Sequence, residues 1–253
     1  NVPNDIPNKN WDIWGARLKM AKSDVYPLRT YMQQVDIITR PGSAPFIDPL
    51  AGIMEVMSKL QQGEQIWIQI LIRPTGNKWQ KKGSKLVKKL HSKTKSTKES
   101  SGEQLTTAEQ DKIRSLEQSV NRPGFESVIR IVTTALSSER ANIHKNNIIS
   151  AFAQFNTVEY NKLVAKKKIN PKRVFQAFIF RWFPLFNSPI KRWDFSWLGR
   201  TSIFNAAELA TLYHLPNKHI NTPHLTWVRA KKSPAPQNVP KQPGPEGGVK
   251  IGF

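Results

Sequence analysis

Alternation of apolar and polar residues predicts two strands in the middle of the chain. Between Gln65 and Arg73 isoleucine recurs at every second position: Ile66, Ile68, Ile70 and Ile72. This period puts the four side chains on one face of a strand, and β-branched residues favour strands. The second strand covers 125–136, and its two faces carry different pairs: Val128 with Val132, and Ile129 with Ile131. Looser patterns predict a strand at 28–37 and a short one near Ile203.

A period of three and four residues predicts helices, each with a recognisable start. The first has Asp48 as its cap and Pro49 in its first turn, and Gly63 follows it as a stop. Its apolar stripe is Leu50, Ile53, Met54, Met57 and Leu60. The starts of four further helices are Thr107 with Gln110, Ser138, Asn170 with Pro171, and Asn205 with Glu208.

In chain order these elements follow the βαββαβ pattern of a ferredoxin-like α+β domain. We therefore expect a mostly antiparallel sheet with helices on one face. The domain would cover 28–215, with a Lys-rich helical insertion at 75–124 between two paired strands. Residues 1–27 would form an extended arm anchored by Trp11 and Trp14. The Pro- and Gly-rich residues 216–253 would form a linker-like tail.

The charge balance favours a polyanionic partner. The chain has 39 Lys and Arg against 18 Asp and Glu, a net charge of +21. Such an excess attracts nucleic acid or an anionic membrane face, although it can also serve solubility alone. The chain has no cysteine, which excludes disulfides, thiolate metal sites and cysteine nucleophiles. The apolar stretch at 174–186 is too short and too polar to cross a bilayer. The chain begins at Asn1, so we expect a fragment or a processed piece.

Two basic runs are the candidate binding residues. The run from Lys78 to Lys98 contains nine lysines and no acid, and a second run lies at 166–173. The candidates for polyanion binding are Lys78, Lys81, Lys82, Lys85, Lys88, Lys89, Lys166, Lys167, Lys168 and Arg173. Lysines of this kind neutralise phosphates without reading bases. Trp79, Trp182 and Trp193 could stack on unpaired bases, although Trp182 also fits the apolar stripe of a helix. A solvated loop and binding to anionic lipid remain the alternatives.

No catalytic, cofactor-binding or metal-binding residues are predicted. The sequence has no glycine-rich phosphate loop, no G-x-S-x-G and no H-E-x-x-H. Asp48 and Glu55 share a helix face, but a cap and a solvated charge explain them. His214, His219 and His224 could ligate a metal, yet a spacing of five does not align on a helix. We expect ordinary loop histidines.

Two stretches resemble a known family. The first joins DPLAGI at 48–53 to GEQIWIQILIRP at 63–74. The second is FNAAELATLYHLP at 204–216, followed by Thr222-Pro223 and AKKSPAP at 230–236. Together they resemble the region that precedes the motor domain in conjugative-transfer, type IV secretion ATPases of the HerA–FtsK superfamily, as found in small-genome uncultivated bacteria. The likeness runs from about Trp11 to Pro240 and is weakest in the Lys-rich insertion.

The resemblance implies a non-catalytic N-terminal assembly and docking domain of a DNA-transferring or secretion ATPase. ATP and Mg²⁺ would then belong only to a motor domain beyond Phe253, and residues 216–253 would lead toward it. Expected partners are other subunits of the secretion or conjugation complex, single-stranded DNA and the inner-membrane surface. The parent protein would be an oligomer, cytoplasmic and peripheral to the cytoplasmic membrane. The alternative is a sequence-nonspecific single-stranded nucleic-acid-binding module that uses the Lys-rich insertion.

Overall fold

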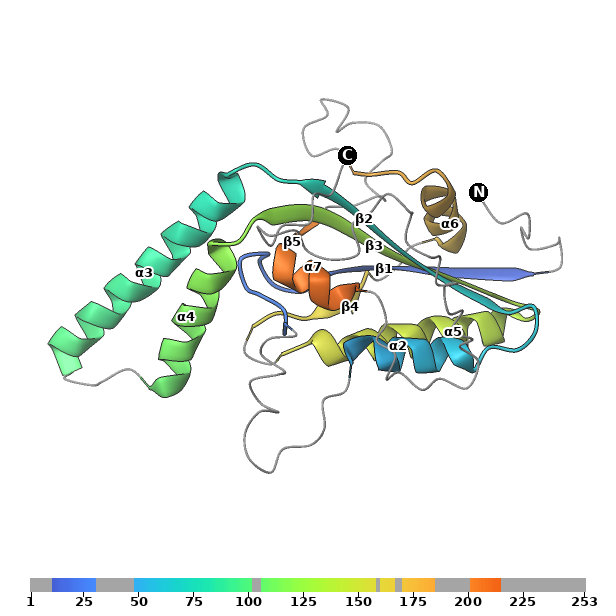
Figure 1. Ribbon diagram of the computed structural model, residues 1–253, viewed down its shortest axis with the longest axis horizontal. Coiled ribbons are helices and arrows are strands. Elements are labelled where there is room, and N and C mark those ends of the chain that lie inside the picture. The colour runs from blue at the N-terminus through green and yellow to red at the C-terminus, as the bar shows by residue number, and fades with distance from the viewer. Residues whose placement is uncertain are drawn as a thin grey trace, which may run out of the picture. The chain divides into compact units, whose positions relative to one another are not determined.

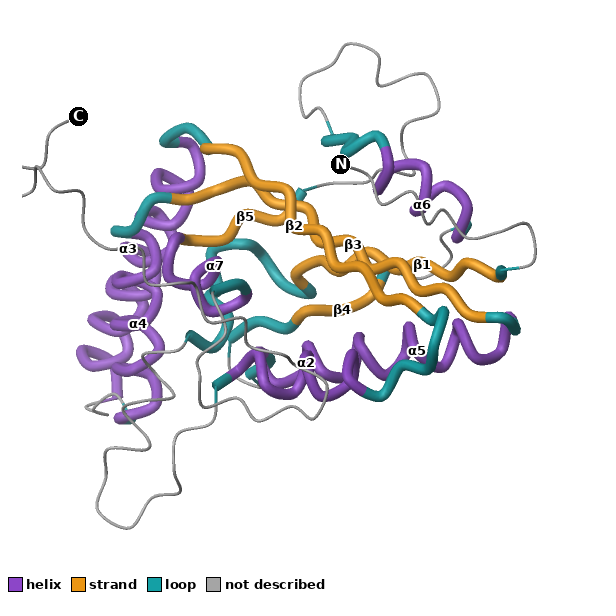
Figure 2. The backbone as a smooth tube through the Cα atoms, turned by 45° about the vertical axis from the view of Figure 1, so that its right-hand side comes forward, coloured by secondary structure: helices purple, strands orange, loops and turns teal. Residues whose placement is uncertain are grey.

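A computed structural model describes residues 11–30, 48–101, 106–157, 160–166, 170–184 and 201–214 (Figures 1 and 2). In 93–101 and 107–108 only the backbone is described. All of these residues belong to one compact unit that spans residues 1–223. The predicted tail at 216–253 lies outside them. The architecture is α+β, with helices packed on an antiparallel sheet.

Within the described ranges the sheet has five strands, and every pairing among them is antiparallel. The strands are β1 (Asp12–Met20), β2 (Gln65–Pro74), β3 (Gly124–Ala135), β4 (Leu163–Ala165) and β5 (Ser202–Asn205). Their order is β2-β3-β1-β4. β2 pairs with β3 along one edge, while β1 and β5 share the other edge of β3. The two strands predicted most firmly, β2 and β3, are therefore confirmed as an antiparallel pair.

Helices cover both faces of the sheet. The helices are α2 (Pro49–Ser58), α3 (Lys78–Ser101), α4 (Thr107–Val120), α5 (Ser138–Ala151), α6 (Pro171–Ile179) and α7 (Ala206–Leu212), and a 3₁₀ turn, η1 (Phe152–Phe155), follows α5. α2 and α5 lie along one face and α6 lies over the other (Figure 2). α3 and α4 pack against each other and come between β2 and β3 in the chain (Figure 1).

The main core lies between the sheet and the pair α2 and α5. Ile66, Ile129 and Ile131 are buried there, and Ile68 and Ile70 pack against them. Val128 and Val132 are buried on the opposite face, so the predicted alternation in both strands is confirmed. Ile72, at the end of the same stripe, is 55% exposed. Each fully buried side chain of this size stabilises the fold by about 1.5–3 kcal/mol.

The expectation that helices cover only one face is wrong because the second face is apolar as well. Trp67 on β2 stacks against Phe175 and Phe178 of α6, with ring centroids 6.4 and 5.9 Å apart. A Cβ added at Gly15 on β1 would lie 2.8 Å from Cβ of Val174. α6 therefore approaches the sheet closely, and the glycine makes room for it. A face that carries tryptophan and valine has to be covered to keep that apolar surface from water.

The expectation of an extended N-terminal arm at 1–27 is wrong for Asp12–Met20. These residues form β1, which lies between β3 and β4 in the sheet. The sequence pattern marks this strand only in part, although the strand is central in the sheet. Gly15 to Leu18 are all buried, and the alternation of Ala16, Leu18 and Met20 with Arg17 and Lys19 is confined to the second half of the strand, after the irregular Ile13-Trp14-Gly15. The strand expected at 28–37 is not formed at 28–30, and the remainder lies outside the described residues.

The predicted helix starts are confirmed at Asp48, Asn170 and Asn205, each of which caps a backbone N–H. Two others are displaced by one residue. The capping box of α4 uses Thr106 with Glu109, and α5 is capped by Ser137. Each start offers two adjacent candidate caps, Thr106 and Thr107 for α4 and Ser137 and Ser138 for α5, so the pattern alone does not decide between them.

Candidate polyanion-binding surface

Six of the predicted lysines lie on one side of α3. Their side chains are all exposed: Lys78, Lys81, Lys82, Lys85, Lys88 and Lys89. We call this set the lysine face. A helix turns by 100° per residue, so the six positions fall within an arc of about 120° and span about 17 Å. No acidic residue occurs between 78 and 92. The surface is therefore a strip of closely spaced positive charges with no negative charge among them.

Packing on the opposite side of α3 fixes the direction of the lysine face. Val87 joins Leu116 and Val120 of α4 and Val25 in a second buried cluster. His91 Nε2 lies 2.8 Å from Glu117 Oε1, which links α3 to α4 by a polar contact. Because this side of α3 is held against α4, the lysines point to solvent.

Trp79 anchors the first turn of α3 and does not offer a stacking platform. Its side chain is 4% exposed, and its Nε1 donates to the carbonyl of Asp24 at 3.3 Å. A Cβ at Gly124 would lie 2.9 Å from Trp79 Cε3, so the indole packs directly on the start of β3. The prediction that Trp79 stacks on bases is wrong. Trp182 is half-buried and stacks on Phe180 at 5.2 Å, and Trp193 lies outside the described residues.

The structure does not bring the second basic run to the lysine face. Arg173 is exposed on α6, and α6 and α3 lie at opposite ends of the sheet (Figures 1 and 2). Lys166 is half-buried and directly follows β4. Lys167 and Lys168 lie outside the described residues. The eight predicted residues that the structure describes therefore do not form one surface.

Lys166 instead joins a row of cations across the sheet face under α6. Arg17 on β1 and Arg130 on β3 are direct cross-strand partners, and the N–H of Lys166 donates to the Arg17 carbonyl at 2.8 Å. We call Lys166, Arg17 and Arg130 the cationic row. Burial lowers the pKa of both arginines to about 10, and for Arg130 the neighbouring Arg17 adds to the effect. The sequence did not reveal this row because Arg17 lay in the expected arm.

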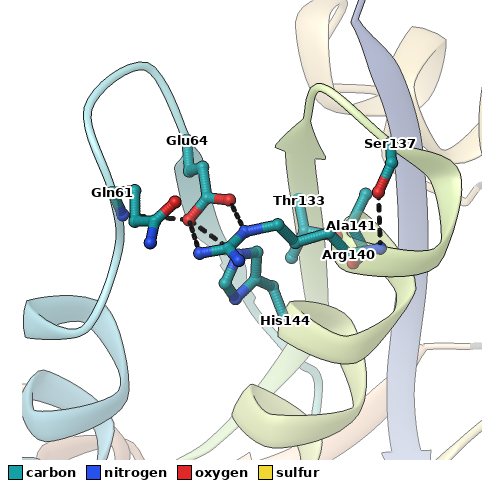
Figure 3. Close-up of polar contacts among 7 residues, drawn as sticks. All are labelled: Gln61, Glu64, Thr133, Ser137, Arg140, Ala141 and His144. Atoms are coloured by element: carbon teal, nitrogen blue, oxygen red, sulfur yellow. Dashed lines mark hydrogen bonds and ion pairs between the residues drawn. The ribbon is translucent and has the colours of Figure 1, made fainter.

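A buried carboxylate, Glu64, ties the start of β2 to α5 (Figure 3). It accepts hydrogen bonds from Arg140 and from the N–H of Gln61, the latter at 2.9 Å, and His144 Nε2 lies 2.9 Å from its Oε2. Burial opposes ionisation of Glu64, but the bonds from Arg140, Gln61 and His144 outweigh it and lower its pKa to about 2. This cluster holds the fold together. It joins residues about 80 positions apart, which sequence patterns do not reveal.

In a second buried carboxylate, Glu208, the pKa is shifted in the opposite direction, upward. It accepts from the N–H of Leu28 at 2.6 Å and from the N–H of Asn205 at 2.7 Å. Burial raises its pKa to about 8, against the effect of these two hydrogen bonds. The contact with Asn205 is the predicted capping box. The contact with Leu28 fixes a segment far away in sequence.

The histidines do not assemble a metal site in the part of the chain that the structure describes. His214 Nε2 lies 2.9 Å from Asp48 Oδ1, which also caps α2. His219 and His224 lie outside the described ranges. Within those ranges no group of three or more His, Asp or Glu side chains could hold a metal ion. No described helix is long and apolar enough to cross a membrane.

Comparison with known proteins gives one match. The model of a family described as a domain of unknown function, DUF8128, matches residues 3–228. No curated protein and no solved structure matches the chain. The match covers most of the 253 residues, including every strand and helix described above. The chain therefore belongs to the DUF8128 family.

Proposed function

We propose that this domain binds nucleic acid through the lysine face, without reading the base sequence. The observation that carries the proposal is the arrangement of α3, with six exposed lysines on one side and a buried apolar side packed on α4. Lysine ammonium groups bind phosphate oxygens as point charges and release condensed counterions, which supplies most of non-specific affinity. A rigid helix holds the charges in place, so less side-chain and backbone entropy is lost on binding.

The base-independent character follows from what α3 presents. The lysines contact phosphates, which position a nucleic acid but carry no sequence information. Trp79, the aromatic side chain of this run, is buried under the start of β3 and does not reach a base. Binding should therefore be electrostatic and sensitive to salt.

The proposal is tested with matched triple variants. Lys81, Lys85 and Lys88 are replaced by Gln in one, and the exposed lysines Lys22, Lys162 and Lys172 in the other, so each loses the same charge. Fluorescence anisotropy with a labelled 20-nucleotide single strand at 100 mM salt gives the affinities. We expect the α3 variant to bind at least tenfold more weakly than the control variant. Equal losses in both would show that only net charge matters, and would contradict the assignment to α3.

We also propose that the fold is ferredoxin-like. The strand order β4-β1-β3-β2, the antiparallel pairing and the placement of α2 and α5 on one face support this. On this proposal α3 with α4 is an insertion between the second and third strands. β5, α6 and α7 are additions after the fourth.

A second proposed function is the assembly and docking domain of a type IV secretion or conjugative ATPase. The resemblance of the stretches at 48–74 and 204–236 supports it, and so does an exposed aromatic group after α6. Phe180 is 62% exposed and stacks on Trp182. Exposed aromatic side chains favour protein interfaces. The chain itself would be non-catalytic, with ATP and Mg²⁺ bound by the motor.

The docking proposal has its own test. We expect the parent protein to carry a glycine-rich phosphate loop after Phe253, and Phe180→Ser to weaken co-purification with the motor domain. A parent sequence that contains no such loop would overturn the proposal, as would measurable ATP hydrolysis by this chain alone.

A further inference from the structure

We propose that β2 pairs with the β2 strand of a second copy of this chain, so that two sheets join edge to edge in a symmetric dimer. β2 is the outer strand on its side of the sheet, because in the described part of the chain it pairs with β3 alone. The inference does not depend on the lysine face, which lies on α3.

The backbone of β2 directs one row of hydrogen-bonding groups away from β3. The N–H of Thr75 donates to the carbonyl of Gly124 at 3.2 Å, so these two residues form a hydrogen-bonded pair at the end of the ladder. In an antiparallel ladder, successive residues of one strand point their N–H and C=O groups alternately toward the partner strand and away from it. No bulge interrupts the register from Gln65 to Pro74. Four residues therefore point these groups to the free edge: Ile66, Ile68, Ile70 and Ile72.

This edge is both unpartnered and unprotected. Among the residues that the structure describes, none forms a hydrogen bond with the outward N–H and C=O groups. Proteins usually guard such an edge with lysines, a bulge or proline, because it is a template for another strand. β2 has no lysine in a chain of 39 Lys and Arg, and its one charged residue, Arg73, is paired with Glu126. Pro74 lies beyond the four outward residues.

The sequence of β2 is self-complementary in an antiparallel register. A two-fold axis at Gln69 makes each outward residue face an outward residue of the second copy. The hydrogen-bonded pairs that result are Ile66 with Ile72, and Ile68 with Ile70, each occurring twice. Every outward N–H in either strand would then meet a carbonyl, which gives eight hydrogen bonds between the strands. On the side of the sheet that faces α2 and α5, isoleucine would meet only isoleucine.

The exposure of Ile72 supports the same register. Its side chain is 55% exposed, although it continues the stripe of the buried Ile66. In the dimer it would lie opposite Ile66 of the second copy and lose contact with water. Arg73 would lie opposite the neutral Gln65, so no like charges would face each other. The second copy is the occupant that the strand itself specifies, because the match needs no other sequence.

The test is analytical ultracentrifugation over a hundredfold range of protein concentration. Salt at about 300 mM screens the repulsion between two chains that each carry a net charge of +21. We expect the wild type to pass from monomer to dimer within this range. We expect Ile72→Lys to raise the dissociation constant of the dimer about tenfold or more, because it places a charge opposite Ile66.

The matched control is Ile143→Lys. Ile143 is 48% exposed and lies on α5, which packs on β1 and β3, so the substitution changes charge and exposed apolar surface equally. We expect it to leave the dissociation constant unchanged. A wild type that stays monomeric would overturn self-pairing and leave the edge to a strand of another protein. Equal effects of the two substitutions would overturn the assignment to β2.

Single cysteines test the register, since the chain has none of its own. At the axis, Gln69 would face its own copy in a non-hydrogen-bonded pair with Cα atoms about 4.5 Å apart, within reach of a disulfide. The two copies of Leu71 would lie four residues apart along the strands, about 13 Å, which is too far. Under oxidising conditions we expect Gln69→Cys to form a covalent dimer and Leu71→Cys to stay mostly unlinked.

Equal linking of the two cysteine variants would overturn the register, and so would an unlinked Gln69→Cys under conditions in which the wild type dimerises. Gln69 also accepts from Arg130, so its replacement removes a contact within the sheet. The comparison of Ile72→Lys with Ile143→Lys leaves that contact intact and tests the edge independently.

Discussion

Replacing Glu64 by Gln should destabilise the fold in a way that depends on pH. Glu64 is the acceptor that joins the start of β2 to Arg140 and His144 of α5. The substitution keeps the size of the side chain but removes its charge. Any loss of stability therefore reports on the ionised form of Glu64.

The magnitude follows from its pKa. The pKa of Glu64 in the folded protein is about 2, against an ordinary value of 4.5. A difference of about 2.5 units corresponds to about 3.4 kcal/mol at pH 7 and about 1.4 kcal/mol at pH 3. Because the folded pKa is depressed, this stability is present above pH 4.5 and is lost as the pH falls toward 2. The Arg140 side chain is 41% exposed, and solvent screening reduces the expected value at pH 7 to about 2 kcal/mol.

Urea unfolding of the wild type and of Glu64→Gln between pH 3 and 7 measures this difference. The control is Glu55→Gln, because Glu55 also pairs with a cation, Lys59, but both side chains are well exposed. We expect the control to unfold at the same urea concentration as the wild type at every pH, because solvent screens an exposed ion pair. A difference between wild type and Glu64→Gln that stays constant from pH 7 to pH 3 would refute the reasoning, since it could not arise from the carboxylate charge.

Three further changes test other parts of the fold. The pKa of Glu208 in the folded protein is raised to about 8. Its contribution to stability is therefore complete below pH 4.5 and falls as the pH rises toward 8. A carboxyl NMR titration with a midpoint below about 5 would contradict this. Trp79→Ala should cost about 3–5 kcal/mol in urea unfolding, because the buried indole anchors α3, and a loss below 1 kcal/mol would show that it does not. Gly63→Ala should cost at least about 1 kcal/mol, since Gly63 has φ +88° and a Cβ would meet Trp11; an unchanged urea midpoint would argue against strain there.

The fold could be predicted where one face of an element is polar and the other apolar. The isoleucine alternation in β2 and the stripe of α2 follow this rule, and the caps at Asp48 and Asn205 mark helix starts by local hydrogen bonds. β1 was not predicted because only its second half alternates, with Arg17 and Lys19 between apolar residues, while Ile13-Trp14-Gly15 has no clear period. The placement of α6 over the second face likewise depends on contacts between distant segments, such as Trp67 with Phe178.

The candidate surface was predictable in part, because some of its features are visible as a local sequence pattern. A run of lysines without acidic residues is a local pattern, and it identified the six lysines that form the lysine face. The environment of Trp79 is not local, since it is buried by Gly124 and by the carbonyl of Asp24. The cationic row and the Glu64 cluster join residues more than 70 positions apart. Such pairs follow from the strand register and helix packing, which the sequence pattern leaves open.

The salt dependence of single-strand binding tests the lysine face most directly. Six phosphate contacts predict a slope of about −4 for log affinity against log salt, or about a 300-fold loss between 50 and 200 mM. Replacing Lys81, Lys85 and Lys88 by Gln should reduce that slope by about 2, to roughly a 20-fold loss. An affinity that does not change with salt, or a variant that keeps the slope of the wild type, would contradict binding through this helix.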